Sequence, residues 1–427
     1  MKMITEAARQ IPVKGEYDVI VVGSGPAGMA AAINAGRMGA KVLLIEALGS
    51  AGGISTSGMM SHFTGNCNCA TYQEILRRAS EKNLYETGNS TIRIHHEMMK
   101  LTYYEMLEEA NVELLLYTTV CDVIMQGDQL TGVVVENKGG RAAYLAQVFI
   151  DGSGDGDVAC KAGAEYLLGR EEDNLMQPAT LMFQVAGIDM ERAALPGSFE
   201  TTVETEKGEL QALARELLPK PAGHVLLYKS TIPGIVTCNM TNVTEIDGTR
   251  AEDLTRAEIV CHKQMPAIVS FLREYVPGYE NCYIIGAASL IGIRETRHFK
   301  GEYTLTRDDI QSARVFEDWV VRDAYFNFDV HNITGAGLDK TGVQHKFTQK
   351  KGYTIPYGCL VPEKIDGLLL SGRNISGTHM AHSNFRAMPI CVATGEAAGI
   401  AAALAVQKNL PVRKVAPADI QARILSL

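Results

Sequence analysis

A strand–turn–helix–strand unit near the N-terminus constrains the fold more than any other feature of the sequence. Residues 17–23 (YDVIVVG) form a continuous apolar and β-branched run, which is typical of a buried parallel strand. The pattern G-x-G-x-x-G occupies residues 23–28, and the Ala-rich stretch 29–38 predicts a helix. Residues 41–45 (KVLLI) predict a second buried strand. This order predicts a βαβ unit with a parallel sheet, as in a doubly wound, Rossmann-like α/β domain.

The glycines of this unit predict a dinucleotide-binding turn. The first allows the tight turn, the second lets the backbone approach a pyrophosphate, and the third lets the helix pack closely on the strand. The helix N-terminus offers free N–H groups and a partial positive charge to phosphates. Glu46 ends the second strand, where a carboxylate can accept hydrogen bonds from ribose hydroxyls. The residues predicted to contact the cofactor here are Gly23, Gly25, Pro26, Ala27, Gly28 and Glu46.

Two further Gly-rich blocks follow along the chain. Residues 52–58 (GGISTSG) combine two glycines, which permit close backbone approach, with hydroxyl side chains; the alternative is a surface turn. Residues 151–157 (DGSGDGD) come after an apolar run at 144–150 and before a short predicted helix at 158–163. The side chain of Asp157 has two possible roles, capping the following helix or contacting the ligand.

The C-terminal part of the chain predicts a strand, a loop and a long helix. Residues 366–372 (DGLLLSG) predict a buried strand that ends in a glycine, and residues 373–386 (RNISGTHMAHSNFR) predict a polar loop. Residues 388–406 predict a helix. Gly395 and Gly399 are four apart in it, which predicts a smooth face for close packing.

These motifs together resemble the bacterial FAD-dependent oxidoreductase family, flavoproteins with two dinucleotide-binding folds that are related in type to fumarate reductase flavoproteins. The matching stretches are GSGPAG (23–28), GGISTSG (52–58), DGSGDGD (151–157), IGIRETRHFKGEYTLT (291–306) and residues 355–399. The resemblance implies FAD, non-covalently bound, and a last helix that directs its N-terminus at the flavin pyrimidine. The further cofactor contacts that it implies are Gly52, Gly53, Thr56, Ser57, Val120, Asp151, Gly154, Asp155, Gly372 and Arg373.

The positions of the motifs predict a discontinuous FAD-binding domain made of residues 1–65, 100–168 and 350–427. Residues 66–99 predict a helical insertion, and residues 169–349 an α+β substrate or cap domain. Within these parts, residues 112–125 and 129–136 predict a hairpin, and residues 306–324 predict a helix. Ligands in such folds bind at the carboxyl ends of the strands, between the domains.

Composition excludes several classes of protein. The 427 residues carry a net charge of −9 without a basic run, which argues against nucleic-acid binding. The longest apolar stretches fall short of the roughly 18 residues of a membrane span. No apolar leader stands at the N-terminus, so the nine cysteines are expected as reduced thiols in the cytoplasm. Cys67 and Cys69 lack a second pair at zinc-finger spacing, so no metal site is predicted.

Candidate catalytic residues surround the expected flavin ring. His379 and His382 precede the last helix, and a histidine suits acid–base work; the alternative is that they brace the loop. Arg386 and Arg294 suit bidentate binding of a carboxylate. A structural ion pair is expected between the two neighbours of Arg294 in the motif, Glu295 and Arg297.

Two more residues complete the candidates. Tyr303 is an alternative proton donor, or else an ordinary strand aromatic. His62 follows the Gly-Gly pair and lies where it can approach the flavin. In the fumarate reductase type the comparable histidine precedes that pair, so a covalent flavin link is not expected here.

The sequence thus predicts an FAD-dependent oxidoreductase that transfers a hydride between flavin N5 and a small, anionic organic substrate. No second nicotinamide-binding unit is evident, so electrons are expected to come from, or leave to, a small molecule or a partner protein. The alternative is a flavin-carrying electron-transfer subunit or binding module without independent turnover. An oligomer is compatible with either.

Overall fold

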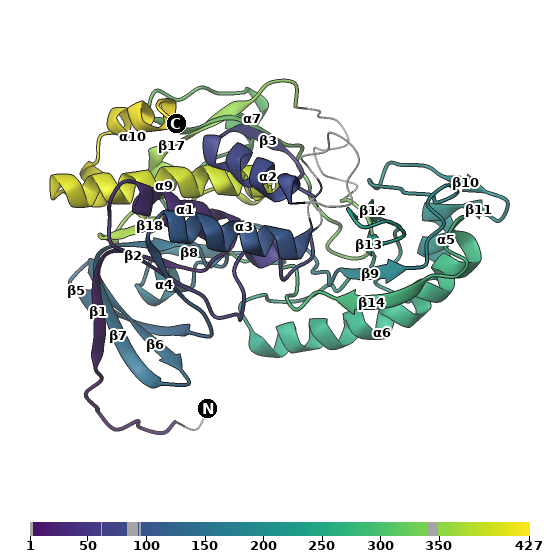
Figure 1. Ribbon diagram of the computed structural model, residues 1–427, viewed down its shortest axis with the longest axis horizontal. Helices are drawn as coiled ribbons and strands as arrows, with labels where there is room; N and C mark the ends of the chain where they lie inside the picture. Colours follow the sequence, from purple (N-terminus) through teal and green to yellow (C-terminus); the bar gives the residue numbers. More distant parts are fainter. Residues whose placement is uncertain (1–2, 61, 83–92, 94, 340–348) are drawn as a thin grey trace.

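A computed structural model describes residues 3–60, 62–82, 93, 95–339 and 349–427. It divides into a larger body with a parallel-rich sheet and a smaller lobe built around a long helix (Figure 1). The two parts have separate hydrophobic clusters. The first draws its buried residues from 19–164 and 299–424, and the second from 179–291.

The main sheet has seven strands in the order β4-β2-β1-β7-β6-β5, with β18 also paired to β7. The pairs among β4, β2, β1 and β7 are parallel, as is β7 with β18, whereas β6 is antiparallel to both β5 and β7. The strands are β1 (Val13–Val22), β2 (Val42–Ile45), β4 (Val112–Leu115), β5 (Thr119–Gln126), β6 (Gln129–Asn137), β7 (Gly140–Asp151) and β18 (Leu368–Leu370).

Helices α1 and α9 pack against one another beside this sheet (Figure 1). The close approach depends on glycine, because a Cβ at Gly395 would lie 2.1 Å from the Ala27 carbonyl oxygen, and one at Gly399 would lie 2.2 Å from that of Ala31. The predicted smooth face is therefore confirmed. The helices of this body are α1 (Pro26–Arg37), η1 (Gly53–Ser55), α2 (Ala70–Glu81), α3 (His96–Glu109), α4 (Asp157–Lys161), α9 (Met388–Lys408), η4 (Val412–Lys414) and α10 (Pro417–Leu425).

Two smaller sheets complete the larger body. One has the order β17-β16-β3 and another is the pair β15-β8. The elements concerned are β3 (Asn66–Asn68), β8 (Tyr166–Leu168), β15 (Arg297–Phe299), α7 (Arg307–Gln311), β16 (Trp319–Tyr325), β17 (Tyr353–Pro356), η3 (Tyr357–Cys359) and α8 (His379–Phe385).

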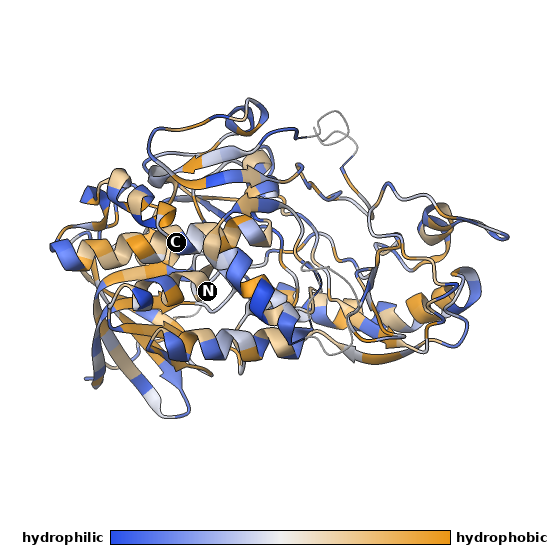
Figure 2. Cartoon of the chain, turned by 45° about the horizontal axis from the view of Figure 1, so that its top comes forward, coloured by the Kyte–Doolittle hydropathy of each residue, from blue (hydrophilic) through white to orange (hydrophobic). Residues whose placement is uncertain are grey.

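The lobe is an antiparallel sheet of order β12-β13-β9-β14 with two helices. Helix α6 alternates between hydrophobic and hydrophilic colouring along its length, as expected for a helix with one buried face (Figure 2). The elements are β9 (Phe183–Ala186), β10 (Glu204–Thr205), β11 (Gly208–Glu209), α5 (Leu210–Leu217), β12 (Leu227–Lys229), β13 (Val236–Cys238), α6 (Ala251–Tyr275) and β14 (Tyr283–Ala287).

Three sequence-based expectations are wrong in detail. Residues 112–125 form two strands, because β4 joins β2 while β5 pairs with β6. The helix predicted over 306–324 ends after α7, since Ala313 takes a left-handed conformation (φ 49°) and the following β16 pairs with β17 and β3. The loop predicted over 373–386 contains helix α8, whose N-cap Thr378 accepts a hydrogen bond from the Ala381 N–H group. The predicted insertion 66–99 lies partly outside the described residues.

Contrary to the expectation that every apolar stretch falls short of a membrane span, α9 is long and apolar enough to cross a membrane, the one such helix within the described residues. Its most apolar window is 89% buried inside the protein. The apolar composition is therefore accounted for by its place in the core, where it packs against both α1 and the main sheet.

The contact between α1 and α9 gives a direct test of the packing. In an ordinary helix, replacing glycine by alanine stabilises by up to about 1 kcal/mol. We expect Gly399→Ala instead to lower the free energy of unfolding by about 2 kcal/mol, because the new methyl group overlaps backbone atoms of α1. Urea unfolding measures this. Gly197→Ala, where a Cβ meets nothing within 4 Å, is the control; equal effects of the two variants would contradict the account.

Candidate functional site

A cavity of about 1060 Å³ lies where the carboxyl ends of β1, β2 and β7 face the lobe. This is the position at which parallel α/β sheets bind ligands. Its walls bring together the predicted Gly-rich turn, the turn after β7, the residues after β18, and side chains of the lobe. The cofactor residues predicted from the sequence that line it are Gly23, Gly25, Pro26, Ala27, Glu46, Gly53, Val120, Gly154, Asp155, Gly372 and Arg373.

The N-terminus of α1 opens into this cavity. Gly25 is its N-cap and Pro26 occupies the first turn, with no side-chain cap among the described residues. The first N–H groups are thus left for a ligand, together with the partial positive charge of the helix end. Gly23 has φ 90°, which permits the tight turn, and a Cβ at Gly28 would lie 1.8 Å from the Gly23 carbonyl oxygen. Gly28 therefore packs the helix on the strand rather than lining the cavity.

Glu46 is held in place by the same turn. Its Oε2 accepts hydrogen bonds from the Ser24 N–H group (2.8 Å) and the Ser24 hydroxyl (2.6 Å). Its Oε1 accepts one from the Leu48 N–H group at 2.8 Å. The carboxylate is thus fixed at the cavity wall, and its predicted bond to a ribose remains a prediction.

The loop at 52–57 supports the cavity from behind. Only Gly53 of its predicted contacts lines the cavity among the described residues; it has φ 52° and lies against Gly25. The Thr56 hydroxyl donates to the Ala51 carbonyl oxygen at 2.6 Å, and the Ser57 and Ser50 hydroxyls are 2.9 Å apart. These hydroxyl groups form hydrogen bonds within the loop and so stabilise its conformation. Gly52 takes φ 104°, which an L side chain rarely adopts.

The turn after β7 is braced by Asp151. This buried carboxylate accepts hydrogen bonds from the Ser153 N–H and hydroxyl groups and from the Ala159 N–H group. Burial raises its pKa to about 6. The structure therefore places Asp151 behind the cavity wall. Asp155 and Arg373, both predicted cofactor contacts, line the wall as an ion pair at 3.0 Å.

Two arginines, Arg294 and Arg386, line the lobe-facing part of the cavity, whose wall there also carries the carboxylates of Glu200 and Glu258. Arg294 is buried there, and its Nη1 donates to the Pro178 carbonyl oxygen at 2.5 Å. Burial, followed by the nearby Arg386, lowers its pKa to about 10, so it stays charged at neutral pH. Arg386 Nη2 lies 2.7 Å from Asp329 Oδ2. Burial alone would raise the pKa of Asp329, but His331 and Arg386 lower it well below its usual range.

Sequence reasoning missed three side chains at this end, namely Tyr228, Asp329 and His331. His331 Nε2 lies 3.3 Å from Asp329 Oδ2, and the Tyr228 hydroxyl accepts from Asn239 Nδ2 at 3.3 Å. None of the three stands in a recognisable motif. Asp329 is 57 positions from its partner Arg386, so the pairing appears only in the folded chain.

The remaining catalytic candidates do not line the cavity. His379 and His382 lie on α8, where His379 Nδ1 contacts Glu295 Oε1 at 2.5 Å. The expected Glu295–Arg297 pair is wrong, because Arg297 Nη1 binds Asp157 Oδ1 at 2.9 Å while Glu295 faces histidines.

Tyr303 and His62 are engaged elsewhere. The Tyr303 hydroxyl donates to Asp309 Oδ2 at 3.0 Å and accepts from Arg314. The His62 ring lies 4.4 Å from the Tyr228 ring, one layer behind the cavity, and burial lowers its pKa to about 4. All nine cysteines are free thiols.

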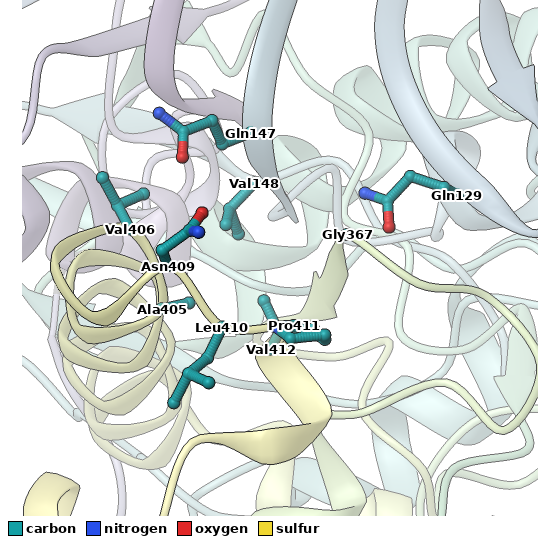
Figure 3. A pocket seen from close by; sticks show the side chains of 10 residues that line it. All are labelled: Gln129, Gln147, Val148, Gly367, Ala405, Val406, Asn409, Leu410, Pro411 and Val412. Atoms are coloured by element: carbon teal, nitrogen blue, oxygen red, sulfur yellow. The ribbon is translucent and has the colours of Figure 1, made fainter.

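A second, smaller pocket of about 220 Å³ lies at the C-terminal end of α9 (Figure 3). Amide side chains such as Gln147 and Asn409, together with apolar side chains such as Leu410, line it. Its lining carries no charged side chain among the described residues, and it includes none of the predicted site residues.

The sequence matches the family described as "FAD dependent oxidoreductase" over residues 18–424. Among solved structures, a geranylgeranyl bacteriochlorophyll reductase-like protein from Thermoplasma acidophilum is 13% identical, with a TM-score of 0.51 over 96% of this chain and 82% of that one. The flavin-dependent brominase Bmp2 is 12% identical, with a TM-score of 0.50 over 96% of this chain and 83% of that one. The p-nitrophenol 4-monooxygenase PnpA from Pseudomonas putida DLL-E4 is 12% identical, with a TM-score of 0.52 over 97% of this chain and 87% of that one. These likenesses confirm the predicted Rossmann-like α/β fold.

A substitution at Gly25 is expected to weaken cofactor binding without affecting the stability of the fold. A Cβ at this position meets nothing within 4 Å in the protein, so Gly25→Ala should leave the stability of the FAD-free chain unchanged. The methyl group would project where a pyrophosphate must approach the backbone. We expect the dissociation constant for FAD to rise at least about tenfold, which corresponds to about 1.4 kcal/mol. Fluorescence titration of the FAD-free protein measures it, and unchanged affinity would contradict the placement.

His331 gives stability a pH dependence. Burial and Arg294 lower its pKa from 6.5 to about 4. The unfolded chain therefore takes up a proton at higher pH than the folded chain does. The stability that neutral His331 contributes is fully present above about pH 6.5 and falls by up to about 3 kcal/mol toward pH 4. We expect His331→Asn to lose less unfolding free energy across this window in urea titrations at each pH. The control is His262→Asn, which replaces an exposed histidine. If the unfolding free energy of His331→Asn changed with pH as steeply as that of the wild type, the prediction would be contradicted.

Proposed function

The chain belongs to the family of FAD-dependent oxidoreductases, and from this premise we propose that it transfers a hydride between flavin N5 and a small, anionic organic substrate. The observation that carries the proposal is the single cavity that joins the Gly-rich turns to Arg294 and Arg386. The same space thus offers a phosphate-binding end and an anion-binding end.

The residues present fit FAD. The cavity volume of about 1060 Å³ is at the upper end for cofactor sites. The open space at Gly25 and the uncapped start of α1 suit the pyrophosphate, and Glu46 is fixed where a ribose hydroxyl can donate to it. When bound, FAD supplies hydride exchange at N5 of its isoalloxazine ring.

Arg294 and Arg386 supply the attraction for an anion. With His331 neutral, the two guanidinium groups and Asp329 sum to one net positive charge. Asp329 neutralises Arg386, whereas the acceptor found for Arg294 within the described residues is an uncharged carbonyl. A carboxylate bound to Arg294 would therefore complete the charge balance. In a site of low polarity such a charge-assisted contact is strong and directional.

His331 is the group proposed to move the proton. Its Nε2 faces the ionised Asp329, which favours the tautomer with a proton on Nε2. Nδ1 is then unprotonated and can accept the proton that leaves an alcohol or amine when hydride departs from the adjacent carbon. The low pKa keeps the imidazole neutral at physiological pH, as a base requires.

A second candidate function is that of an electron-transferring subunit. Three consecutive apolar side chains on the edge strand β14, Tyr283, Ile284 and Ile285, are 54%, 40% and 45% exposed, which favours contact with another protein. Turnover by the purified chain with a small substrate and a small-molecule electron acceptor would reject this candidate.

Replacing Arg294 tests the proposed anion site. Wild-type holoprotein is mixed anaerobically with a panel of hydroxy- and amino-carboxylates and with the matching neutral amides, and flavin bleaching is followed. We expect reduction by carboxylates only. For the fastest carboxylate, Arg294→Met should lower kcat/KM by about 100-fold or more while the flavin content is retained.

The control is Arg192→Met, which removes a surface arginine of the same lobe paired with Glu280. It should leave the rate unchanged. Equal reduction by the neutral amides, or an Arg294→Met variant as active as wild type, would contradict the proposal.

A further inference from the structure

Three donor side chains from two distant segments of the chain converge beside the end of the cavity that Arg294 and Arg386 line. Glu295 Oε1 lies 2.8 Å from His298 Nε2 and 2.5 Å from His379 Nδ1. One donor atom from each of the three residues lies within 4.8 Å of the others. Their side chains are 0%, 5% and 8% exposed.

We propose that Glu295, His298 and His379 form a binding site for a divalent transition metal of the Zn²⁺ type. Two imidazoles and one carboxylate are a donor set that Zn²⁺ and Fe²⁺ accept, whereas Mg²⁺ and Ca²⁺ prefer oxygen atoms throughout. Glu295 and His298 are three positions apart, but His379 is 84 positions from Glu295, so only the folded chain brings the three donors together.

Without a metal the three side chains form a hydrogen-bonded triad centred on Glu295. Both imidazole nitrogens are directed at the same carboxylate oxygen, Oε1, while Oε2 is held by the Gln177 N–H group at 3.1 Å. That outer contact fixes the carboxylate as a ligand would be fixed. A cation bound between His298 Nε2, His379 Nδ1 and Glu295 Oε1 would replace the two hydrogen bonds that now join these atoms.

A second observation concerns unpartnered nitrogens. His298 Nδ1 is buried without a hydrogen-bond partner, and so is Nδ1 of His382, whose ring packs edge-on against His298 with a centroid distance of 4.8 Å. Both side chains are more than nine-tenths buried. These two nitrogens are not among the three proposed donors, because His298 faces Glu295 through Nε2; they show that the buried cluster also holds imidazole nitrogens that the described residues leave unsatisfied.

Metal binding requires a small side-chain movement. Ligands at about 2.0–2.1 Å from a tetrahedral metal are about 3.3 Å apart. From the present 2.8 Å and 2.5 Å, the distance from Glu295 Oε1 to His298 Nε2 must therefore widen by about 0.5 Å and the distance to His379 Nδ1 by about 0.8 Å. The exposed acidic run Glu171–Asp173 lies at this end of α8, where Glu171 Oε1 accepts from the His379 N–H group at 3.1 Å. It attracts cations, although Arg170 pairs with Asp173.

A metal at this site would link the two segments that carry Arg294 and Arg386. Glu295 follows Arg294 directly, and α8 ends just before Arg386. A metal bound here would fix these segments relative to one another without touching the substrate. The proposal concerns a structural metal beside the cavity and does not depend on the substrate.

Metal content tests the proposal. Purified holoprotein is treated with a chelator, dialysed against Zn²⁺ and assayed for zinc by elemental analysis. We expect one zinc per chain, bound about 100-fold more weakly in Glu295→Gln and in His379→Gln. The control is His262→Gln, which removes an exposed histidine paired with Glu258 on α6 and should bind as wild type does. No stoichiometric zinc, or equal binding in the cluster variants, would overturn the proposal.

X-ray absorption at the zinc edge of the wild-type holoprotein provides a readout that does not depend on the folding of any variant. We expect nitrogen and oxygen ligands at about 2.0–2.1 Å, with the outer scattering of two imidazoles. Sulfur ligands at about 2.3 Å would assign the zinc to cysteine thiols and would overturn the proposal.

Discussion

The packing of α1 between β1 and α9 is the constraint on which the site depends. At three points, Gly28, Gly395 and Gly399, a single methyl group would overlap backbone atoms of a neighbour. These contacts leave α1 one position along its axis, and its N-terminus therefore opens at the carboxyl end of the sheet. Because backbone amides cannot be redirected by side-chain rotation, the proposed phosphate-binding end of the cavity is built into the packing of the core.

Two of the three arginines that line the cavity are paired with a carboxylate of the protein. Asp155 neutralises Arg373 near the Gly-rich turns, and Asp329 neutralises Arg386 at the far end. Arg294 is left to carry the positive charge that a substrate would meet. Burial makes this imbalance effective, since a charge in a poorly solvated site is attracted to a counterion far more strongly than one at the surface.

The sequence was most informative where function depends on the backbone. The glycine turn, its helix and the smooth face of α9 were all predictable, because a glycine is required wherever two backbones touch. Side-chain sites were less predictable. Asp329 meets Arg386 only after folding, and on α8 His379 contacts Glu295 while His382 packs against His298, both outside the cavity lining. Residues 306–324 were misread because β16 gains its stability from pairing with β17 and β3, which local propensity does not contain.

The central claim is that an anion binds beside the flavin, at Arg294 and Arg386. The most direct measurement is the flavin absorption difference spectrum of the holoprotein during titration with succinate and, separately, with its neutral diamide. The account predicts a saturable change with succinate that weakens as ionic strength rises, and little change with the diamide. Identical responses to the two compounds, or none to any small carboxylate, would contradict it.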